Sequence, residues 1–233
     1  MSDLETDPRE TDATPSPPAG PEFTLLEARV VPLGGIRGMS VARTLPNREL
    51  PTVGAWCFLD HFGPDTEPMS VLPHPHTGLQ TVTWLFSGEV RHRDNTGSDV
   101  LIRPGELDVM TSGAGIAHSE MSPRPASPLP APAPLHGLQL WVALPDSARN
   151  GPSAFGHHAQ LPHYRDTTVD ATVLVGALGG VTSPATAYSG LIGAQLDLTP
   201  GRRSSLSTRH SSTRCWSSTA RSRWTAPRSG PGR

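Results

Sequence analysis

Two pairs of residues in this sequence have a spacing that could hold a metal ion. His74 and His76 flank a proline, and Glu120 follows His118 by two positions. On an extended segment, residues i and i+2 point to the same side, so each pair can present both side chains to one ion. Three imidazoles and one carboxylate would leave two positions of an octahedral ion open. Such a set suits Fe(II), Mn, Co, Ni or Cu better than Ca or Mg, and it can bind O₂ or substrate oxygens.

The other histidines are interpreted as structural or solvent-exposed groups. His92, in an Arg-His-Arg-Asp run, is interpreted as a solvated hairpin residue, with a place behind the ligands as the alternative. His61 follows an apolar run and is expected to be a satisfied structural group. His157, His158 and His163 lie in a polar stretch and are expected to be exposed. A single His-x-His pair is weak support for a metal site, whereas two such pairs near strand-like segments are stronger.

Short apolar runs separated by turns must position these pairs. The chain has 23 Gly and 26 Pro among 233 residues, and this content argues against a helical bundle. Strand-like runs rich in β-branched and aromatic residues recur along the chain and end at turn signals, which predicts an all-β sandwich or barrel. These runs are residues 26–31, 55–59, 81–86, 99–102, 107–110, 138–142, 172–175, 187–189 and 193–198.

Composition argues against several classes of protein. No run of about 18 apolar residues occurs, so a membrane-spanning helix is not expected. Residues 1–22 are acidic and proline-rich without an apolar stretch, so they are interpreted as a disordered leader and not as a secretory signal. The chain has 2 cysteines, too few for a disulfide framework, and a cytoplasmic location is therefore expected.

Five blocks of the sequence resemble the pirin family. The similarity extends from about Arg29 to Pro200 and is densest between Gly54 and Leu144. Five blocks in the same order make the resemblance specific, and one departure is Gln80, where pirins usually carry Glu. The blocks are FLDHFGP (58–64), HPHTGLQTVT (74–83), PGEL (104–107), MTSGAGIAHSE (110–120) and HGLQLWV (136–142).

The resemblance implies a fold and a metal site. Pirins are bicupins, with two cupin (jelly-roll) β-barrels in one chain and the metal in the N-terminal barrel. The family's ligands match His74, His76, His118 and Glu120, which implies one divalent transition metal, Fe(II) first, with Mn, Ni, Co or Cu as alternatives. Because the pirin carboxylate ligand comes from the later His-x-Glu pair, Gln80 is expected to leave metal binding intact.

The resemblance leaves two functions open. Some pirins resemble quercetin 2,3-dioxygenases, which open a flavonol ring with O₂; Glu120 would then be the catalytic base as well as a ligand. Other pirins are regulators that bind a transcription factor or a metabolic enzyme through their surface. The first function implies a small aromatic, flavonol-like substrate and O₂, and the second a protein partner. Neither implies a membrane or a nucleic acid.

The resemblance and the composition together predict four regions. Residues 1–22 form the leader, and residues 23–145 form the metal-binding barrel, with a proline-rich loop at 122–134. Residues 146–200 comprise a linker and an incomplete second cupin barrel. With later strands of that barrel missing, Val173, Val175, Leu196 and Leu198 are expected to lack a covering layer. Residues 201–233 form a tail.

The tail differs in kind from the sequence before it. Residues 202–233 carry 8 Arg, 9 Ser and no acidic residue, whereas residues 1–201 carry 11 Arg and 21 acidic residues. The chain has Arg but no Lys, which fits a GC-rich gene. An altered reading frame of such a gene tends to encode a sequence rich in Arg and Ser. This origin is favoured over an arginine-rich nucleic-acid arm with stacking Trp216 and Trp224. The tail is expected to be disordered.

Overall fold

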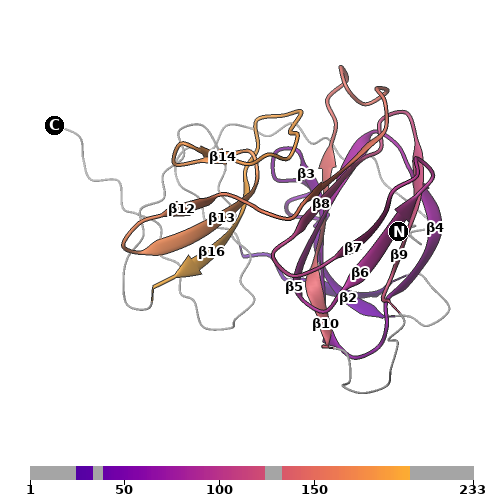
Figure 1. Cartoon of the computed structure of the whole chain (residues 1–233), viewed down its shortest axis with the longest axis horizontal. Coiled ribbons are helices and arrows are strands. Elements are labelled where there is room, and N and C mark those ends of the chain that lie inside the picture. Colours follow the sequence, from indigo (N-terminus) through magenta and orange to yellow (C-terminus); the bar gives the residue numbers. More distant parts are fainter. Residues whose placement is uncertain (1–24, 34–38, 124–132, 200–233) are drawn as a thin grey trace.

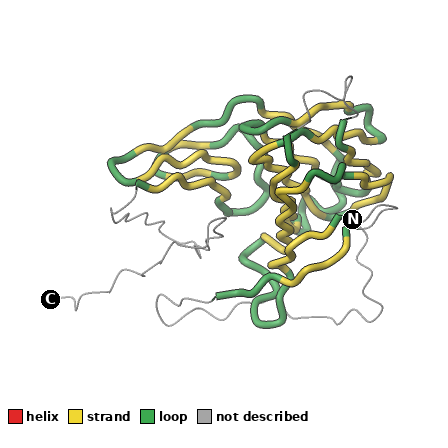
Figure 2. The backbone as a smooth tube through the Cα atoms, turned by 90° about the horizontal axis from the view of Figure 1, so that it is seen from below, coloured by secondary structure: helices red, strands yellow, loops and turns green. Residues whose placement is uncertain are grey.

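Strands and the turns between them account for the regular structure in the described part of the computed structural model, where no helix occurs (Figure 2). The structure describes residues 25–33, 39–123 and 133–199. The predicted leader, most of the proline-rich loop and the tail from residue 201 lie outside these ranges. Within them, no helix is long and apolar enough to cross a membrane. The predicted all-β class is confirmed.

A seven-stranded antiparallel sheet is the largest layer (Figure 1). Its strand order is β1-β2-β3-β10-β5-β8-β11, so strands far apart in the sequence lie side by side. The long strand β10 pairs with β3 on one side and with β5 on the other. The strands are β1 (Arg29–Pro32), β2 (Ser40–Leu45), β3 (Trp56–Asp65), β5 (Leu79–Ser87), β8 (Leu107–Thr111), β10 (Leu135–Ala143) and β11 (Ala154–His158).

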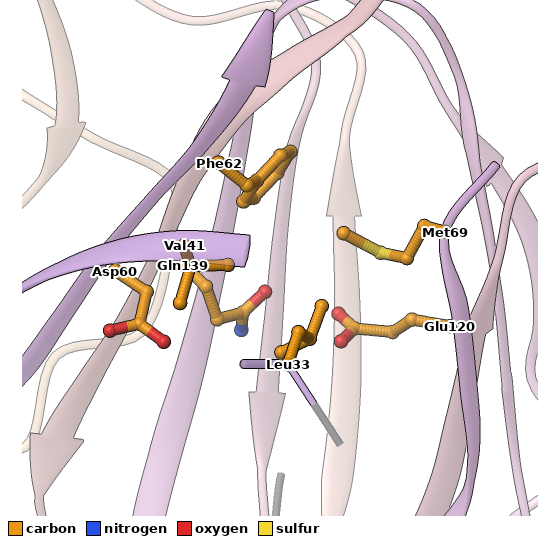
Figure 3. A pocket seen from close by; sticks show the side chains of 7 residues that line it. All are labelled: Leu33, Val41, Asp60, Phe62, Met69, Glu120 and Gln139. Carbon is orange, nitrogen blue, oxygen red and sulfur yellow. The ribbon is translucent and has the colours of Figure 1, made fainter. Parts of the chain in front are cut away.

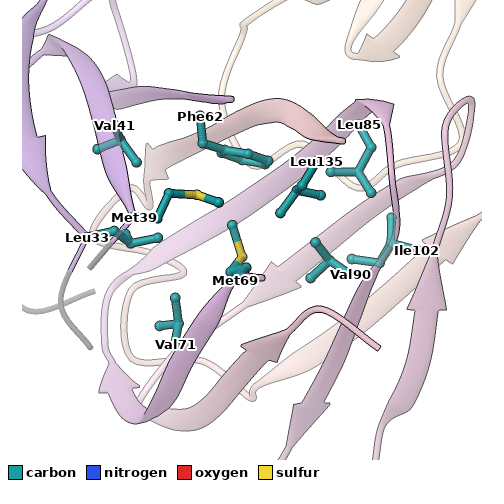
Figure 4. Close-up of a cluster of buried hydrophobic side chains, with 10 residues drawn as sticks. All are labelled: Leu33, Met39, Val41, Phe62, Met69, Val71, Leu85, Val90, Ile102 and Leu135. Carbon is teal, nitrogen blue, oxygen red and sulfur yellow. The ribbon is translucent and has the colours of Figure 1, made fainter. Parts of the chain in front are cut away.

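A four-stranded antiparallel sheet packs against this layer and carries both predicted ligand pairs. Its order is β4-β9-β6-β7, with β4 (Ser70–His76), β9 (Ile116–Met121), β6 (Val90–Asp94) and β7 (Asp99–Ile102). The hydrophobic core between the two sheets takes side chains from both of them (Figure 4). Among these, Phe62, Leu85 and Ile102 are almost completely buried, which fixes the two sheets against each other.

Strand β5 contributes side chains to two hydrophobic clusters, one on each face of its sheet. Successive side chains of a strand point to opposite faces of the sheet. Leu85 therefore packs in the core between the two sheets, whereas Val82 and Trp84 pack in a second hydrophobic cluster on the opposite face. The β-branched and aromatic residues of this run suit a strand that is buried on both faces.

A smaller unit packs on that opposite face. It consists of a three-stranded sheet, β12-β13-β16, and a two-stranded sheet, β14-β15. Leu174 and Val175 join the second hydrophobic cluster with Val82 and Trp84. In Figure 1 this unit lies to the left of the two larger sheets. The strands are β12 (His163–Arg165), β13 (Val169–Val175), β14 (Ala177–Leu178), β15 (Val181–Thr182) and β16 (Gly193–Leu198).

The smaller unit covers more of its apolar side chains than the sequence suggests. Val173 and Val175 are buried, so the expectation that they lack a covering layer is wrong. Val175 packs against β5, and Val173 lies in a third cluster with Leu178. Leu198, by contrast, is 41% exposed, as expected for a strand without a covering layer.

Most of the strand-like runs lie in strands, and one does not. Residues 187–189 are irregular, and Ser189 and Gly190, which follow Tyr188, are typical of a loop. Part of the stretch predicted to be a linker is also a strand: β11 pairs with β8 at the edge of the seven-stranded sheet.

Candidate metal centre

The pairing of β4 with β9 brings His74 and His76 together with His118. Among the described residues, Glu120 groups with His118 and His92 and not with His74 and His76. His74 lies opposite His118, and Val71 lies opposite Glu120. The register shifts between Val71 and His74, so an irregularity in β4 re-aims the histidines that follow it. β4 is an edge strand of its sheet, and Pro75 is tolerated there because an edge strand has one side free of ladder hydrogen bonds.

Three imidazole rings form one cluster. The ring centroids are 4.8 Å apart for His74 and His76, 4.5 Å for His74 and His118, and 5.1 Å for His76 and His118. One ring nitrogen from each histidine lies within 4.8 Å of the other two. His76 and His118 are buried, and His74 is half-buried, so the cluster approaches the surface at His74.

The ring nitrogens of this cluster are suited to bind a metal ion. Nδ1 of His74 lies 2.9 Å from the carbonyl oxygen of Leu72. A carbonyl only accepts, so Nδ1 carries the proton and Nε2 keeps its lone pair. The Nε2 atoms of His74 and His118 are buried and have no hydrogen-bond partner among the described residues. A buried polar atom that lacks a partner is costly, and a metal ion in the cluster would satisfy both atoms.

The three histidines are held in the neutral form that binds metal. Burial lowers the pKa of His76 to about 3, and the neighbouring His74 adds to this effect. Burial, together with His74, His92 and His76, lowers the pKa of His118 to about 2. Burial also lowers the pKa of His74. All three imidazoles are therefore neutral at physiological pH, as ligation requires.

Glu120 lies beside this cluster, deep between the sheets. One carboxylate oxygen of Glu120 and one ring nitrogen each of His118 and His92 lie within 4.8 Å of one another. Thr83 Oγ1 lies 3.3 Å from Glu120 Oε1 and 3.1 Å from Gln139 Oε1. Burial raises the pKa of Glu120 to about 7. The carboxylic acid and the carboxylate are therefore both accessible near neutral pH.

A small cavity borders Glu120 on the side of the seven-stranded sheet (Figure 3). Its volume is about 10 Å³, about the space of one water molecule. It is lined by Leu33, Val41, Asp60, Phe62, Met69, Glu120 and Gln139. The amide nitrogen of Gln139 is buried and has no partner in the part of the chain that the structure describes, so this small space is polar on one side.

His92 is not the solvated residue that the sequence suggests. It is 2% exposed, because β6 lies inside the four-stranded sheet and turns this side chain toward the interior. His92 Nε2 lies 3.1 Å from Asp94 Oδ2, and its Nδ1 lies 3.4 Å from His118 Nδ1. Its ring stacks on Phe155 of β11. The spacing of His92 and Asp94, again i and i+2, is the signal in the sequence that could have found this pair.

The remaining singled-out residues lie away from the cluster. The Gln80 amide donates to Thr111 Oγ1 (2.9 Å) and to the Thr186 carbonyl (3.1 Å), so it links β5 to the smaller unit. His61 lies within hydrogen-bond distance of His136, Nε2 to Nε2 at 2.8 Å, in keeping with a structural role. His157 and His163 are exposed, as expected, whereas His158 is half-buried, so the expectation that it is exposed is wrong; all three lie in strands.

A family model described as Pirin matches residues 38–142, the range that contains His74, His76, His118 and Glu120. Residues 38–142 are therefore a pirin domain.

Individual relatives extend the match beyond this domain. A Pseudomonas aeruginosa protein provisionally named a quercetin 2,3-dioxygenase is 47% identical over 173 residues, covering 72% of this pirin and 52% of that protein. A pirin-like protein of Caulobacter vibrioides is 38% identical, covering 76% and 62%. The crystal structure of quercetin 2,3-dioxygenase from Acinetobacter baumannii is 41% identical with a TM-score of 0.68, covering 74% and 56%.

These matches confirm the cupin-type fold, and the match to the Acinetobacter baumannii structure covers most of this chain. The chain spans between 52% and 62% of the length of these three relatives.

Proposed function

We propose that this pirin binds one divalent transition metal and opens a flavonol-like aromatic substrate with O₂. The proposed ligands are His74, His76, His118 and Glu120, with Fe(II) as the first candidate metal and Mn, Ni, Co or Cu as alternatives. The observation that carries the proposal is the neutral histidine cluster with two buried, unpartnered Nε2 atoms. The names of two of its relatives point to the same reaction class.

Glu120 is the proposed catalytic base. Its pKa, raised to about 7 by burial, suits a group that accepts the proton of a flavonol hydroxyl near neutral pH. Thr83 holds one carboxylate oxygen through its hydroxyl, which fixes the orientation of the carboxylate. When bound, the metal ion would supply positive charge for the substrate oxygens and redox chemistry for O₂.

The substrate is expected to approach from the side of His74. The cavity beside Glu120 holds about one water molecule, so a flavonol does not fit there. His74 is the least buried member of the cluster, and Leu72 beside it is 47% exposed. An apolar, exposed residue next to the cluster suits the entry of an aromatic ring.

The test measures flavonol loss and O₂ uptake by the chain loaded in turn with Fe(II), Mn, Co, Ni and Cu. Glu120→Gln is expected to reduce turnover by about 100-fold or more while reducing bound metal far less, because the amide oxygen still coordinates weakly but cannot take a proton. Glu89→Gln, which changes an exposed carboxylate, serves as the matched control. Equal proportional loss of metal and turnover in Glu120→Gln would make Glu120 a ligand only.

A second function is a metal-bearing regulator that binds a transcription factor or a metabolic enzyme without turnover. The small size of the cavity beside Glu120 favours this candidate, since the described interior offers no room there for a flavonol. Full metal loading without flavonol loss under any of the five metals would decide for this second function.

A further inference from the structure

We propose that Asp94 and His92 together set the tautomer of His118, so that Nε2 of His118 stays available to a metal ion. His92 and Asp94 are then positioning residues, which act on the metal through His118 and do not touch it. This inference rests on the proposed function, because it takes His118 as a ligand. Neither His92 nor Asp94 belongs to the proposed set of metal ligands.

The chain of contacts starts at Asp94. Its Oδ1 accepts hydrogen bonds from the backbone N–H of Thr96 (2.8 Å), the Thr96 hydroxyl (2.6 Å) and the backbone N–H of Ser98 (3.1 Å). These three donors occupy one carboxylate oxygen and leave Oδ2 for His92. An ionised carboxylate only accepts, so Nε2 of His92, 3.1 Å from Oδ2, carries the proton.

The proton position on His92 determines the proton position on His118. A neutral imidazole with its proton on Nε2 offers Nδ1 as an acceptor. Nδ1 of His118 lies 3.4 Å from that atom and is therefore the donor. Nε2 of His118 is left with its lone pair, and this is the atom that is buried without a partner.

His74 reaches the same state by a different route. There Nδ1–H of His74 donates a hydrogen bond to the carbonyl oxygen of Leu72, which leaves Nε2 unprotonated. Two ligands from two strands therefore present the same ring nitrogen to the cluster. A metal-bound histidine that donates its other N–H to a carboxylate or carbonyl is oriented in this way, and the partner raises its basicity.

The surroundings prevent His92 from turning away from this arrangement. The pairing of β6 with β9 places His92 opposite Glu120 and Asp94 opposite His118. The side chains of His92 and Asp94 are 3% and 0% exposed. Phe155, from the facing seven-stranded sheet, stacks on the His92 ring at 4.3 Å between centroids and 19° between planes. Both sheets thus fix the plane of the ring.

The alternative is that His92 is itself a ligand. His92, His118 and Glu120 place ligand atoms within 4.8 Å of one another, which is compatible with a second metal position. Such a site would need a free lone pair on His92. Its Nε2 is committed to Asp94, and its Nδ1 faces the Nδ1 proton of His118. The contacts therefore favour positioning over ligation.

The decisive variant is Asp94→Asn. Thr96 and Ser98 supply three hydrogen-bond donors to the position of Oδ1, so the amide oxygen of the Asn side chain must occupy that position. The amide NH₂ then takes the position of Oδ2 and faces His92 Nε2. His92 is forced to carry its proton on Nδ1, and His118 must shift its own proton to Nε2. Nitrogen-15 NMR of the imidazoles in the metal-free protein reads this change directly. We expect Nδ1–H on His118 in the wild type and Nε2–H in the variant.

Metal affinity gives the second measurement, by competition titration with Co(II) or Ni(II). Asp94→Asn is expected to weaken binding by about 10- to 100-fold. Asp99→Asn removes an equal charge from an exposed residue of the neighbouring strand β7 and is expected to leave the affinity unchanged. His92→Asn places an amide oxygen near the lost acceptor, so it should retain more affinity than His92→Leu.

The outcomes separate this inference from the proposed function. Nε2–H on His118 in the wild type, or unchanged tautomer and affinity in Asp94→Asn, would overturn the positioning role. A loss in His92→Asn as large as that in His118→Ala would make His92 a ligand and overturn it as well. If the predicted tautomers are found but the wild type binds no metal, the tautomer control stands and the proposed function fails.

Discussion

Nδ1 of His157 lies 2.7 Å from Oδ1 of Asp108, while the second oxygen of this buried carboxylate has no hydrogen-bond partner within residues 25–33, 39–123 and 133–199. This contact links the edge strand β11 to its neighbour β8 in the seven-stranded sheet. Burial raises the pKa of Asp108 to about 6, although the hydrogen bond and the charge of His157 act in the opposite direction. The ion pair therefore only partly compensates the desolvation of the carboxylate.

Asp108→Asn is expected to stabilise the protein in a pH-dependent way. Because the folded pKa of Asp108 exceeds its ordinary value of 3.8, the free energy of unfolding of the wild type falls as the pH rises from about 4 to about 6. Asn still accepts from His157 but does not ionise. Denaturant unfolding at pH 4 to 8 should show the relative stability of the variant growing by up to about 3 kcal/mol and levelling off above pH 7.

The control for this prediction has the opposite sign. Arg91 lowers the pKa of the exposed Asp99, so Asp99→Asn should become more destabilising, not less, as the pH rises through the acid range. A difference between wild type and Asp108→Asn that stays constant with pH would contradict the assignment of the raised pKa to Asp108.

The double variant His74→Ala/His76→Ala is expected to lose most of the bound metal. It removes two of the four proposed ligands and one of the two unpartnered Nε2 atoms. Elemental analysis after metal loading measures the occupancy. His163→Ala, which removes an exposed histidine paired with Asp170, should retain the wild-type metal content. Full occupancy in the double variant would rule out this ligand set.

Gly137→Ala is expected to destabilise the core by about 1–3 kcal/mol, because the extra methyl group has no room. A Cβ at Gly137 would lie 2.6 Å from the carbonyl oxygen of Trp84 and 2.7 Å from the ring of Phe62. Gly190→Ala is the matched control, since no atom of the described residues lies within 4 Å of its Cβ position. Denaturant midpoints compare the two variants, and equal midpoints would show that β10 can shift to make room.

The hydrogen bond between Trp84 and Gln195 should couple the smaller unit to the seven-stranded sheet. Trp84 Nε1 donates to Gln195 Oε1 at 2.8 Å. A double-mutant cycle with Trp84→Phe and Gln195→Leu is expected to give a coupling energy of about 1 kcal/mol. A coupling energy near zero would mean that water replaces the lost partner.

The two-residue spacing along the chain predicted the two proposed ligand pairs, because the members of each pair lie in the same strand. His74 and His76, like His118 and Glu120, share one side of their strands, and this follows from the two-residue period. The meeting of His74 with His118 depends on the β4–β9 register and on the irregularity in β4, which no local pattern specifies.

Other parts of the site depend on contacts between strands. Thr83 and Gln139 reach each other from neighbouring strands β5 and β10, and Thr83 also reaches Glu120 in the other sheet. His92 looks solvated between two arginines, yet those neighbours point to the opposite face of the strand. The burial of Val173 and Val175 likewise depends on packing against elements distant in the sequence.

Trp141 contacts the histidine cluster, so its fluorescence can report metal binding there. Its indole stacks on Phe58 at 3.9 Å and meets the ring of His76 at 5.0 Å between centroids. Arg43 lies over the other aromatic ring of this stack, 4.4 Å from the centroid of Phe58. Open-shell ions such as Co(II), Ni(II) and Cu(II) quench indole emission at short range. The intrinsic fluorescence of Trp141 should therefore fall as the cluster fills, so that occupancy can be followed in solution without a dye.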